Sequence, residues 1–227
     1  MGKSCEIKLL GAAPSHFVNR VQFVLNLKSI EYEFIDENLN CKSELLLTSN
    51  PVHKKVPVLI HANKPPILES LIIIEYLDEV YHDIHPILPS DPLERAHNRF
   101  WANYIDTKYF ALFEELRRTP GQEGKKEVKK QLDEASELLE EVFVKSSNGK
   151  AYFGGDDVGY IDVVLGCFLA WIKFVEKLNK FKIFDEVRTP KLLEWTNRIW
   201  SHEALKDAIC GSEALTNHYA MLQIKKP

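Results

Sequence analysis

The sequence has few cysteines, and the four it has are widely separated. They are Cys5, Cys41, Cys167 and Cys210. None pair as Cys-x-x-Cys and none has a histidine at metal-ligand spacing, so no metal site is indicated. We expect reduced structural thiols, as is usual for a cytosolic chain. Cys41 is followed by Lys42, a charge that can activate a thiol, which makes it the one candidate for a reactive cysteine.

Long apolar runs are also missing. The longest extends from residue 161 to 172, contains Asp162, and falls short of the ~20 residues that a membrane-spanning helix needs. Near the N-terminus, the charge of Glu6 stands where the apolar region of a secretory signal would begin. We therefore expect a cytoplasmic protein without a membrane partner.

Neither sign of charge is in large excess, since the net charge is -4. The one basic cluster, residues 125–130, is interrupted by Glu127 and is best interpreted as a solvated helix face. Nothing here predicts a nucleic-acid partner. At 227 residues and 45% hydrophobic content, the chain can bury one large core or two modest ones.

The first eighty residues alternate between strand and helix patterns. Strands are predicted at 7–10, 32–36, 56–60 and 67–68, and helices from 15 to 28, 43 to 47 and 70 to 80. Such an order predicts a mixed sheet covered by helices.

The proline-rich residues 82–91 predict a linker. No strand pattern follows it. Helices are predicted at 93–118 (straight or kinked), 123–145, 157–178, from 189, and once or twice within 201–222. We therefore predict an α/β domain over 1–81 and an all-helical domain over 92–227.

Two neighbouring motifs carry most of the functional information. Residues 50–60 place Val56-Pro57 inside an apolar run, and Leu68-Glu69-Ser70 puts an acid and a hydroxyl at the start of an apolar helix. A Pro-bent strand edge can pair with a peptide backbone, and a helix start can hold a carboxylate. Together the motifs suit a small peptide ligand.

Further motifs extend this picture along the chain. They are Lys8–Gly11, Ser15-x-Phe17-x-x-Arg20-Val21, Asn40–Ser43, Asp91-Pro92-x-Glu94-Arg95-Ala96, Arg99–Ala102 and Ile105-Asp106-x-Lys108. In this order and spacing they resemble the cytosolic glutathione transferases, specifically the plant tau class. The resemblance implies a thioredoxin-like N-terminal domain and an all-α C-terminal domain. It also implies a homodimer that conjugates glutathione to hydrophobic electrophiles without a metal, with peroxide reduction as a side activity.

The resemblance assigns the catalytic role to Ser15. A hydroxyl that donates a hydrogen bond to the glutathione sulfur stabilises the thiolate, and the N–H groups at a helix start act in the same direction. The alternative is that Ser15 only caps the helix, and the two roles can coexist.

Glutathione-binding roles fall on three further positions: Val56, Glu69 and Ser70. The resemblance implies that a cis Pro57 turns the backbone of Val56 toward the cysteinyl residue of glutathione. It also implies that Ser70 holds the γ-glutamyl carboxylate, while Glu69 accepts from the γ-glutamyl ammonium group. The alternatives are an ordinary helix cap for Ser70 and a favourable helix-start charge for Glu69.

Lysines complete the predicted glutathione site. Lys42 and Lys55 resemble the pair that meets the glycyl carboxylate, although both can equally be surface lysines. We expect Lys54 to face solvent. Arg20, one turn after Ser15, is expected to pair with an acid.

The electrophile is expected between the domains, over Ser15. Candidate wall residues are Phe17, Tyr109, Phe110, Phe113, Leu215 and Tyr219. Aromatic residues at helical spacing are more often core than pocket, so packing is the alternative for each.

Some residues depart from the family pattern. At the catalytic turn, Ala13 stands where the family often has a tryptophan and His16 where it often has a proline. Gly159 stands where many transferases of other classes place a Ser or Thr helix cap, three residues before Asp162. Because the first two changes alter the surroundings of the thiol, a non-catalytic carrier of hydrophobic ligands or glutathione conjugates is a second hypothesis. A thiol–disulfide exchanger would need cysteine at position 15.

Overall fold

The computed structural model describes residues 6–206, 208–209, 215–217 and 219–220. The chain divides into two compact units. The first contains the residues before 87 together with the described residues from Glu203 onward, and the second spans residues 87–202.

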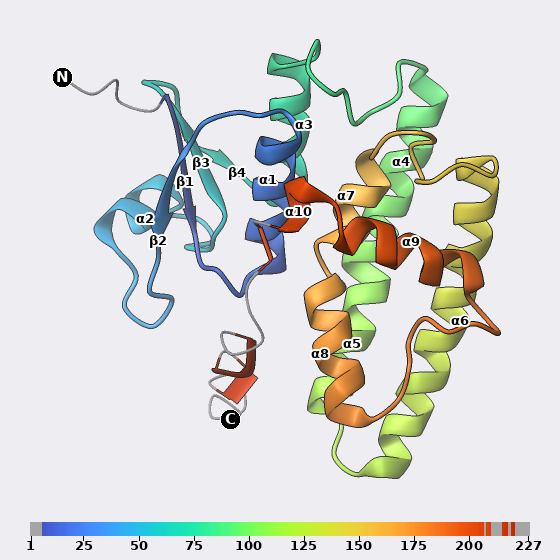
Figure 1. The fold of residues 1–227 in the computed structure, drawn as a ribbon. Coiled ribbons are helices and arrows are strands. Elements are labelled where there is room, and N and C mark those ends of the chain that lie inside the picture. The colour runs from blue at the N-terminus through green and yellow to red at the C-terminus, as the bar shows by residue number, and fades with distance from the viewer. Residues whose placement is uncertain (1–5, 207, 210–214, 218, 221–227) are drawn as a thin grey trace. The chain divides into compact units, whose positions relative to one another are not determined.

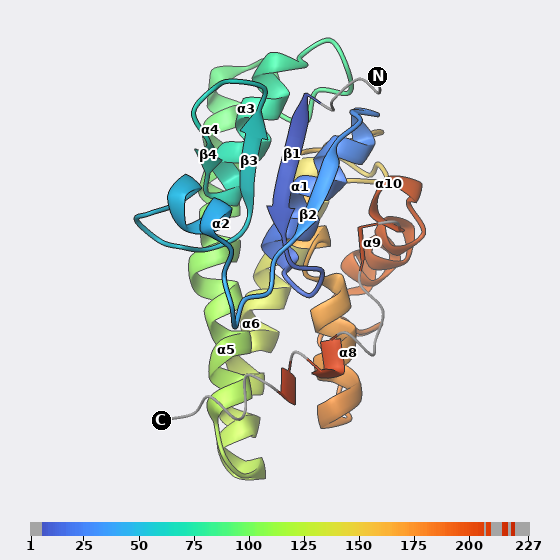
Figure 2. The same ribbon diagram turned by 90° about the vertical axis from the view of Figure 1, so that its left-hand side faces the viewer.

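The first unit is built on a mixed four-stranded sheet, as the sequence predicts (Figures 1 and 2). Its strands are β1 (Ile7–Gly11), β2 (Glu33–Asp36), β3 (Val58–His61) and β4 (Ile67–Leu68), in the spatial order β2-β1-β3-β4. β1 pairs parallel with β2 and antiparallel with β3, which pairs antiparallel with β4.

Helices cover both faces of this sheet. They are α1 (His16–Leu27), α2 (Glu44–Ser49) and α3 (Ser70–Val80), while α10 (Glu203–Lys206) packs against α1. α1 and α3 pack together on one side and α2 lies on the other (Figure 1). Successive strand residues point to opposite faces. Leu10 therefore joins Leu46 of α2 and Val58 in one buried cluster.

A fully buried lysine closes the first unit where α3 ends. The Lys28 Nζ atom lies 2.8 Å from Asp78 Oδ1 and donates to the main-chain oxygens of Tyr81 (3.2 Å), Ile84 (2.7 Å) and His85 (3.0 Å). Lys28 follows the last residue of α1, and through these bonds its ammonium group holds the chain that follows α3.

The second unit is helical, as predicted. Its elements are α4 (Pro92–Tyr104), a π-helical turn η1 (Ile105–Tyr109), α5 (Phe110–Arg118), α6 (Gln122–Ser147), α7 (Tyr160–Gly166), α8 (Leu169–Asn179) and α9 (Pro190–Trp200). The single helix predicted over 93–118 is interrupted by the π-helical turn, and the one predicted over 157–178 is divided at residues 167–168.

Asp162 anchors the core of the second unit. Its carboxylate accepts hydrogen bonds from the main-chain N–H groups of Phe153, Gly154 and Gly159, each at 2.9 Å, and from the indole of Trp195 at 2.7 Å. Burial raises the pKa of Asp162 to about 6, while the four donors lower it. A Cβ at Gly154 would lie 2.7 Å from the Gly159 nitrogen, so the close approach of these two segments requires glycine.

The C-terminal segment departs from the predicted domain division. The sequence placed residues 92–227 in one helical domain, whereas α10 packs against α1 in the first unit. In the described part of the chain, no helix is both long and apolar enough to cross a membrane.

Candidate active site

Ser15 stands at the N-terminus of α1, directly after β1 and a tight turn. The Ser15 N–H donates to the Ala12 oxygen at 2.9 Å, which closes the turn, and the Ser15 Oγ atom accepts from the Val18 N–H at 3.4 Å. The predicted capping role is therefore confirmed. Because a hydroxyl both donates and accepts, the cap bond leaves its hydrogen for another acceptor. The half-buried side chain keeps access to solvent.

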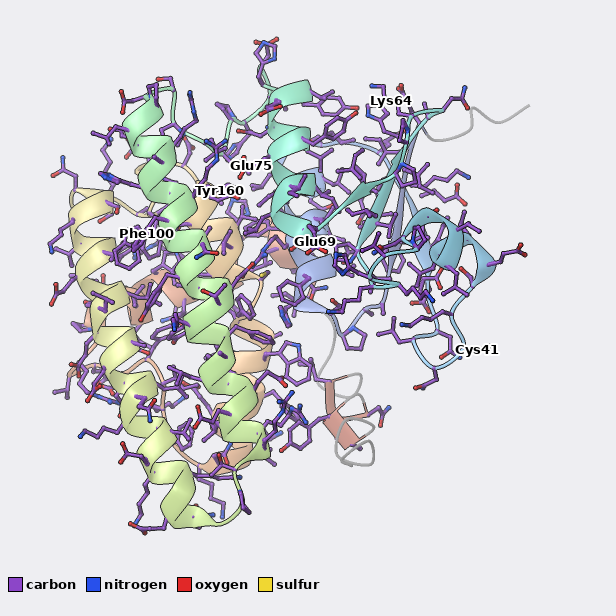
Figure 3. All side chains as sticks on the ribbon, turned by 180° about the vertical axis from the view of Figure 1, so that it is seen from behind. Cys41, Lys64, Glu69, Glu75, Phe100 and Tyr160 are labelled. Carbon is purple, nitrogen blue, oxygen red and sulfur yellow. The ribbon has the colours of Figure 1, made fainter. Side chains whose placement is uncertain are left out.

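The start of α3 carries the next two predicted residues. Glu69 occupies the N-cap position with φ 68°, and Ser70 is the first helical residue. A non-glycine residue in this left-handed region is strained, and such strain often accompanies ligand clamps. The Glu69 carboxylate is exposed, at the start of α3 in Figure 3, and its nearest ion-pair partner is His53 at 3.9 Å.

Arg20 links the two helix starts. Its guanidinium is fully buried, and Nη1 donates to Ser70 Oγ at 2.9 Å. This bond positions the Ser70 hydroxyl, which is itself 6% exposed. The sequence assigned Arg20 only an acidic partner and did not predict this contact with the candidate site.

The loop before β3 is held by Asn50. This residue is 2% exposed, its Oδ1 accepts from the His53 N–H at 3.1 Å, and its Nδ2 donates to the Lys55 oxygen at 3.0 Å. The following Val56–Pro57 peptide bond is cis, as the resemblance implies. Asn50 is thus a structural support of the site that the motif contained but that the sequence did not single out.

The predicted lysines lie on this loop and on the one facing it. Lys42 Nζ donates to the Lys54 oxygen at 2.8 Å, which leaves two ammonium hydrogens for a ligand. The Lys55 side chain is exposed. Their role toward a carboxylate stays a prediction. Cys41 sits beside Lys42 on the exposed loop in Figure 3.

The pocket candidates are distributed over both units. In the first, Phe17 is half-buried against His16 (ring centroids 4.0 Å apart), Leu215 is buried and Tyr219 is half-buried. Their role toward an electrophile stays a prediction.

In the second unit, Tyr109 is buried with its hydroxyl 3.0 Å from Ser136 Oγ and its ring against Phe113. Burial raises the pKa of Tyr109. These contacts favour the packing alternative for Tyr109 and Phe113. Phe110 is half-buried and contacts Phe168.

The other residues singled out in the sequence behave in different ways. His16, which departs from the family pattern, is buried at the start of α1, whereas Ala13 is exposed. Cys167 is buried, with its thiol donating to the Val164 oxygen at 3.1 Å, and Cys5 and Cys210 lie outside the described residues. Within the described ranges, no group of three or more His, Cys, Asp or Glu residues is arranged to hold a metal ion.

Comparison with known proteins gives the same family over the whole chain. Residues 5–79 match the family model of the glutathione S-transferase N-terminal domain, and residues 122–198 match that of the C-terminal domain. Glutathione S-transferase U17 from Arabidopsis thaliana is 50% identical over 89% of both chains, and Glutathione S-transferase U18 from the same plant is 47% identical over 88% of both.

Solved structures agree. A tau class glutathione S-transferase from mango (Mangifera indica) superposes with a TM-score of 0.91 at 46% identity, covering 96% of this chain and 98% of that one. A rice transferase solved in complex with glutathione gives a TM-score of 0.85 at 32% identity over 97% and 99% of the two chains. The chain therefore belongs to the glutathione S-transferase family, and within it to the plant tau class.

Proposed function

We propose that this transferase joins the thiolate of glutathione to hydrophobic electrophiles, with Ser15 as the residue that activates the thiol. The observation that carries the proposal is the hydroxyl of Ser15, which is half-buried at a helix start and whose hydrogen is not used by the cap bond. The rice relative was solved with glutathione, which supports glutathione as the co-substrate here.

The required energy is within reach of this geometry. A free thiol has a pKa of about 8.5 and is only a few per cent ionised at neutral pH. Lowering the pKa by about two units requires about 2.7 kcal/mol of preferential binding of the anion. One hydrogen bond to a charged acceptor, together with the dipole at the start of α1, has this magnitude.

The rest of the tripeptide is proposed to lie along the first unit. Ser70 and the start of α3 would bind the γ-glutamyl carboxylate, Glu69 the γ-glutamyl ammonium group, and Val56 the cysteinyl backbone. Lys42 and Lys55 would meet the glycyl carboxylate. The buried Arg20–Ser70 bond and the Asn50 contact support this arrangement because they hold the Ser70 hydroxyl and the main chain at Lys55 in place before glutathione arrives.

The residues proposed to line the electrophile site are the candidates named from the sequence: Phe17, Tyr109, Phe110, Phe113, Leu215 and Tyr219. A peroxide is proposed as an alternative substrate: the thiolate would attack its O–O bond and release an alcohol or water, and a second glutathione would convert the resulting sulfenic acid to glutathione disulfide and water. A carrier function is the second candidate, favoured by the altered residues Ala13 and His16 beside Ser15. Reduced glutathione is kept in the cytosol, so a cytoplasmic location is part of the proposal.

A homodimer is also proposed. Leu93 and Phe100 of α4 are 64% and 60% exposed and lie two helical turns apart on one face. An isologous dimer contact through this face of α4 would bury both apolar side chains. Sedimentation should give twice the 26.2 kDa chain mass, and Phe100→Glu should reduce it to one chain. Wild-type protein that sediments as a single chain would refute the dimer.

The catalytic proposal is tested by comparing Ser15→Gly with Ser15→Thr in a conjugation assay with an aryl halide. Glycine costs an N-cap only a few tenths of a kcal/mol, so Ser15→Gly removes the hydroxyl while keeping the helix. We expect its rate at pH 7 to fall at least about tenfold, as a thiol pKa returning toward 8.5 requires, whereas Ser15→Thr keeps most of the activity. Equal rates in Ser15→Gly and wild type would reject Ser15 as the activating group. Ligand binding without any turnover in wild type would favour the carrier.

A further inference from the structure

Helix α1 presents two asparagines to the C-terminal segment, defined here as residues 203–206, 208 and 209. Asn26 Nδ2 donates to the Ala204 oxygen at 2.8 Å, and Asn19 Nδ2 donates to the Ala208 oxygen at 2.6 Å. The two asparagines are seven residues apart and so share one face of the helix. Both side chains make the same kind of bond, from an amide to a main-chain oxygen of this segment.

Asn19 makes further contacts that Asn26 does not. Its Nδ2 also lies 3.3 Å from the Ala13 oxygen and 3.3 Å from Gln22 Oε1, and the residue is only 2% exposed. An amide carries two hydrogens, so one of them must be shared among these three acceptors. Asn19 therefore joins the C-terminal segment, α1 and the chain before α1 through a single buried group.

The Ala13 oxygen belongs to the turn that presents Ser15. This turn spans residues 12–15 and is closed by the bond from the Ser15 N–H to the Ala12 oxygen. Ala13 itself is exposed, so its side chain does not hold the turn in the interior. The buried Asn19 side chain holds this peptide group through the hydrogen bond from its amide to the Ala13 oxygen.

We propose that Asn19 is a positioning residue for thiol activation: by binding the Ala13 and Ala208 oxygens together, it fixes the turn that aims the Ser15 hydroxyl and makes that aim depend on the C-terminal segment. The proposal rests on the activating role of Ser15. Its physical basis is that a hydrogen bond weakens steeply when its angle or distance departs from the optimum. A turn that is free to rotate would spread the Ser15 hydroxyl over geometries that do not point at the sulfur.

The test compares Asn19→Ala with Asn26→Ala, because each loses one amide bond to the C-terminal segment and only the first also frees the Ala13 oxygen. The readout is the pKa of enzyme-bound glutathione, measured from the ultraviolet absorbance of its thiolate during a pH titration. We expect Asn19→Ala to raise this pKa by about half a unit to one unit, the size expected when one hydrogen bond is lost. Asn26→Ala should leave it at the wild-type value, although both variants melt at a lower temperature. Asn19→Ser, with a small polar side chain, replaces Asn19→Ala if the alanine variant does not fold.

The outcomes separate this inference from the function on which it rests. If the thiol pKa in the wild-type complex equals that of free glutathione, the role of Ser15 fails. If wild type lowers the pKa and Asn19→Ala or Asn19→Ser lowers it equally, Asn19 is only a structural residue and the inference is wrong. Equal shifts in the Asn19 and Asn26 variants would also overturn it, because the effect would then come from the C-terminal segment alone and not from the Ala13 oxygen.

Discussion

Replacing Lys28 by methionine isolates the contribution of one buried cation to the first unit. The Lys28 side chain is completely buried, and its partner Asp78 is 8% exposed. Four oxygens lie within 3.2 Å of the ammonium nitrogen, which has three hydrogens to donate. Methionine fills a similar volume without any charge, so the substitution removes these bonds with little change in packing.

The expected loss follows from burial. Removing one partner of a buried ion pair typically costs about 3–5 kcal/mol, because the remaining charge and oxygens lose their partner without regaining water. The matched control is Lys8→Met, since Lys8 also lies 2.8 Å from its partner, Glu33, but the two side chains are 40% and 50% exposed. An exposed pair contributes about 1 kcal/mol or less.

The assay is urea unfolding, with limited proteolysis of residues 81–86 as a second readout. We expect Lys28→Met to lower the free energy of unfolding by at least about 3 kcal/mol and to speed cleavage after α3, while Lys8→Met changes neither by much. The double variant Lys28→Met/Asp78→Leu should recover part of the loss, because it also removes the buried carboxylate that had lost its bond to Lys28. Equal losses in Lys28→Met and Lys8→Met would refute the argument that burial sets the cost.

Two further predictions concern the core of the second unit. At pH 8, Asp162→Asn should lower the free energy of unfolding by about 3–5 kcal/mol, because the new amide nitrogen faces two N–H groups whose hydrogen bonds the carboxylate oxygen had accepted. Urea unfolding measures the difference, with Asp157→Asn at an exposed position as the control. In the folded protein the pKa of Asp162 is about 6, above its ordinary value of 3.8. Between these two pH values the native state therefore binds a proton that the unfolded chain has released. The Asp162 contribution to the free energy of unfolding should therefore fall as pH rises from about 4 to about 6, and a wild-type protein without that slope relative to Asp162→Asn would contradict the assignment. Gly154→Ala should lower the melting temperature by several degrees, since its Cβ would meet main-chain atoms at 2.7 Å. The control, Glu127→Ala at an exposed position, should leave the melting temperature unchanged. If Gly154→Ala also melts at the wild-type temperature, the segments around Gly154 and Gly159 can move apart without cost.

The sequence predicted most of the secondary structure because periodicity and turn residues are local signals. All four strands occur where expected. The helices after Ser15, Ser43 and Thr189 do so too, and each of these helices starts at a predicted cap or proline. Family membership was equally readable, since ordered motifs extend from Lys8 to Lys108.

Contacts between distant segments could not be predicted in this way. The π-helical turn at Ile105–Tyr109 has no local sequence signal, because its residues favour an ordinary helix. Glu140 of α6 caps the start of α9 by accepting from the Lys191 and Leu192 N–H groups, and that pairing depends on how two helices pack. The return of α10 to α1 depends on packing in the same way.

The candidate site shows the same division. The residues proposed to touch glutathione follow from motifs, whereas their supports, Arg20, Asn50 and Asn19, became visible only through buried hydrogen bonds. Polar side chains of these types are as common on protein surfaces as in such supporting roles. Only their burial shows that they must form hydrogen bonds inside the protein, and the sequence does not reveal that burial.

The most direct test of the central claim is a crystal structure of this protein with glutathione bound. Our account predicts that the glutathione sulfur lies within hydrogen-bonding distance of Ser15 Oγ, with the γ-glutamyl carboxylate at the start of α3 beside Ser70. A sulfur atom bound away from Ser15, with well-ordered glutathione elsewhere on the protein, would contradict it.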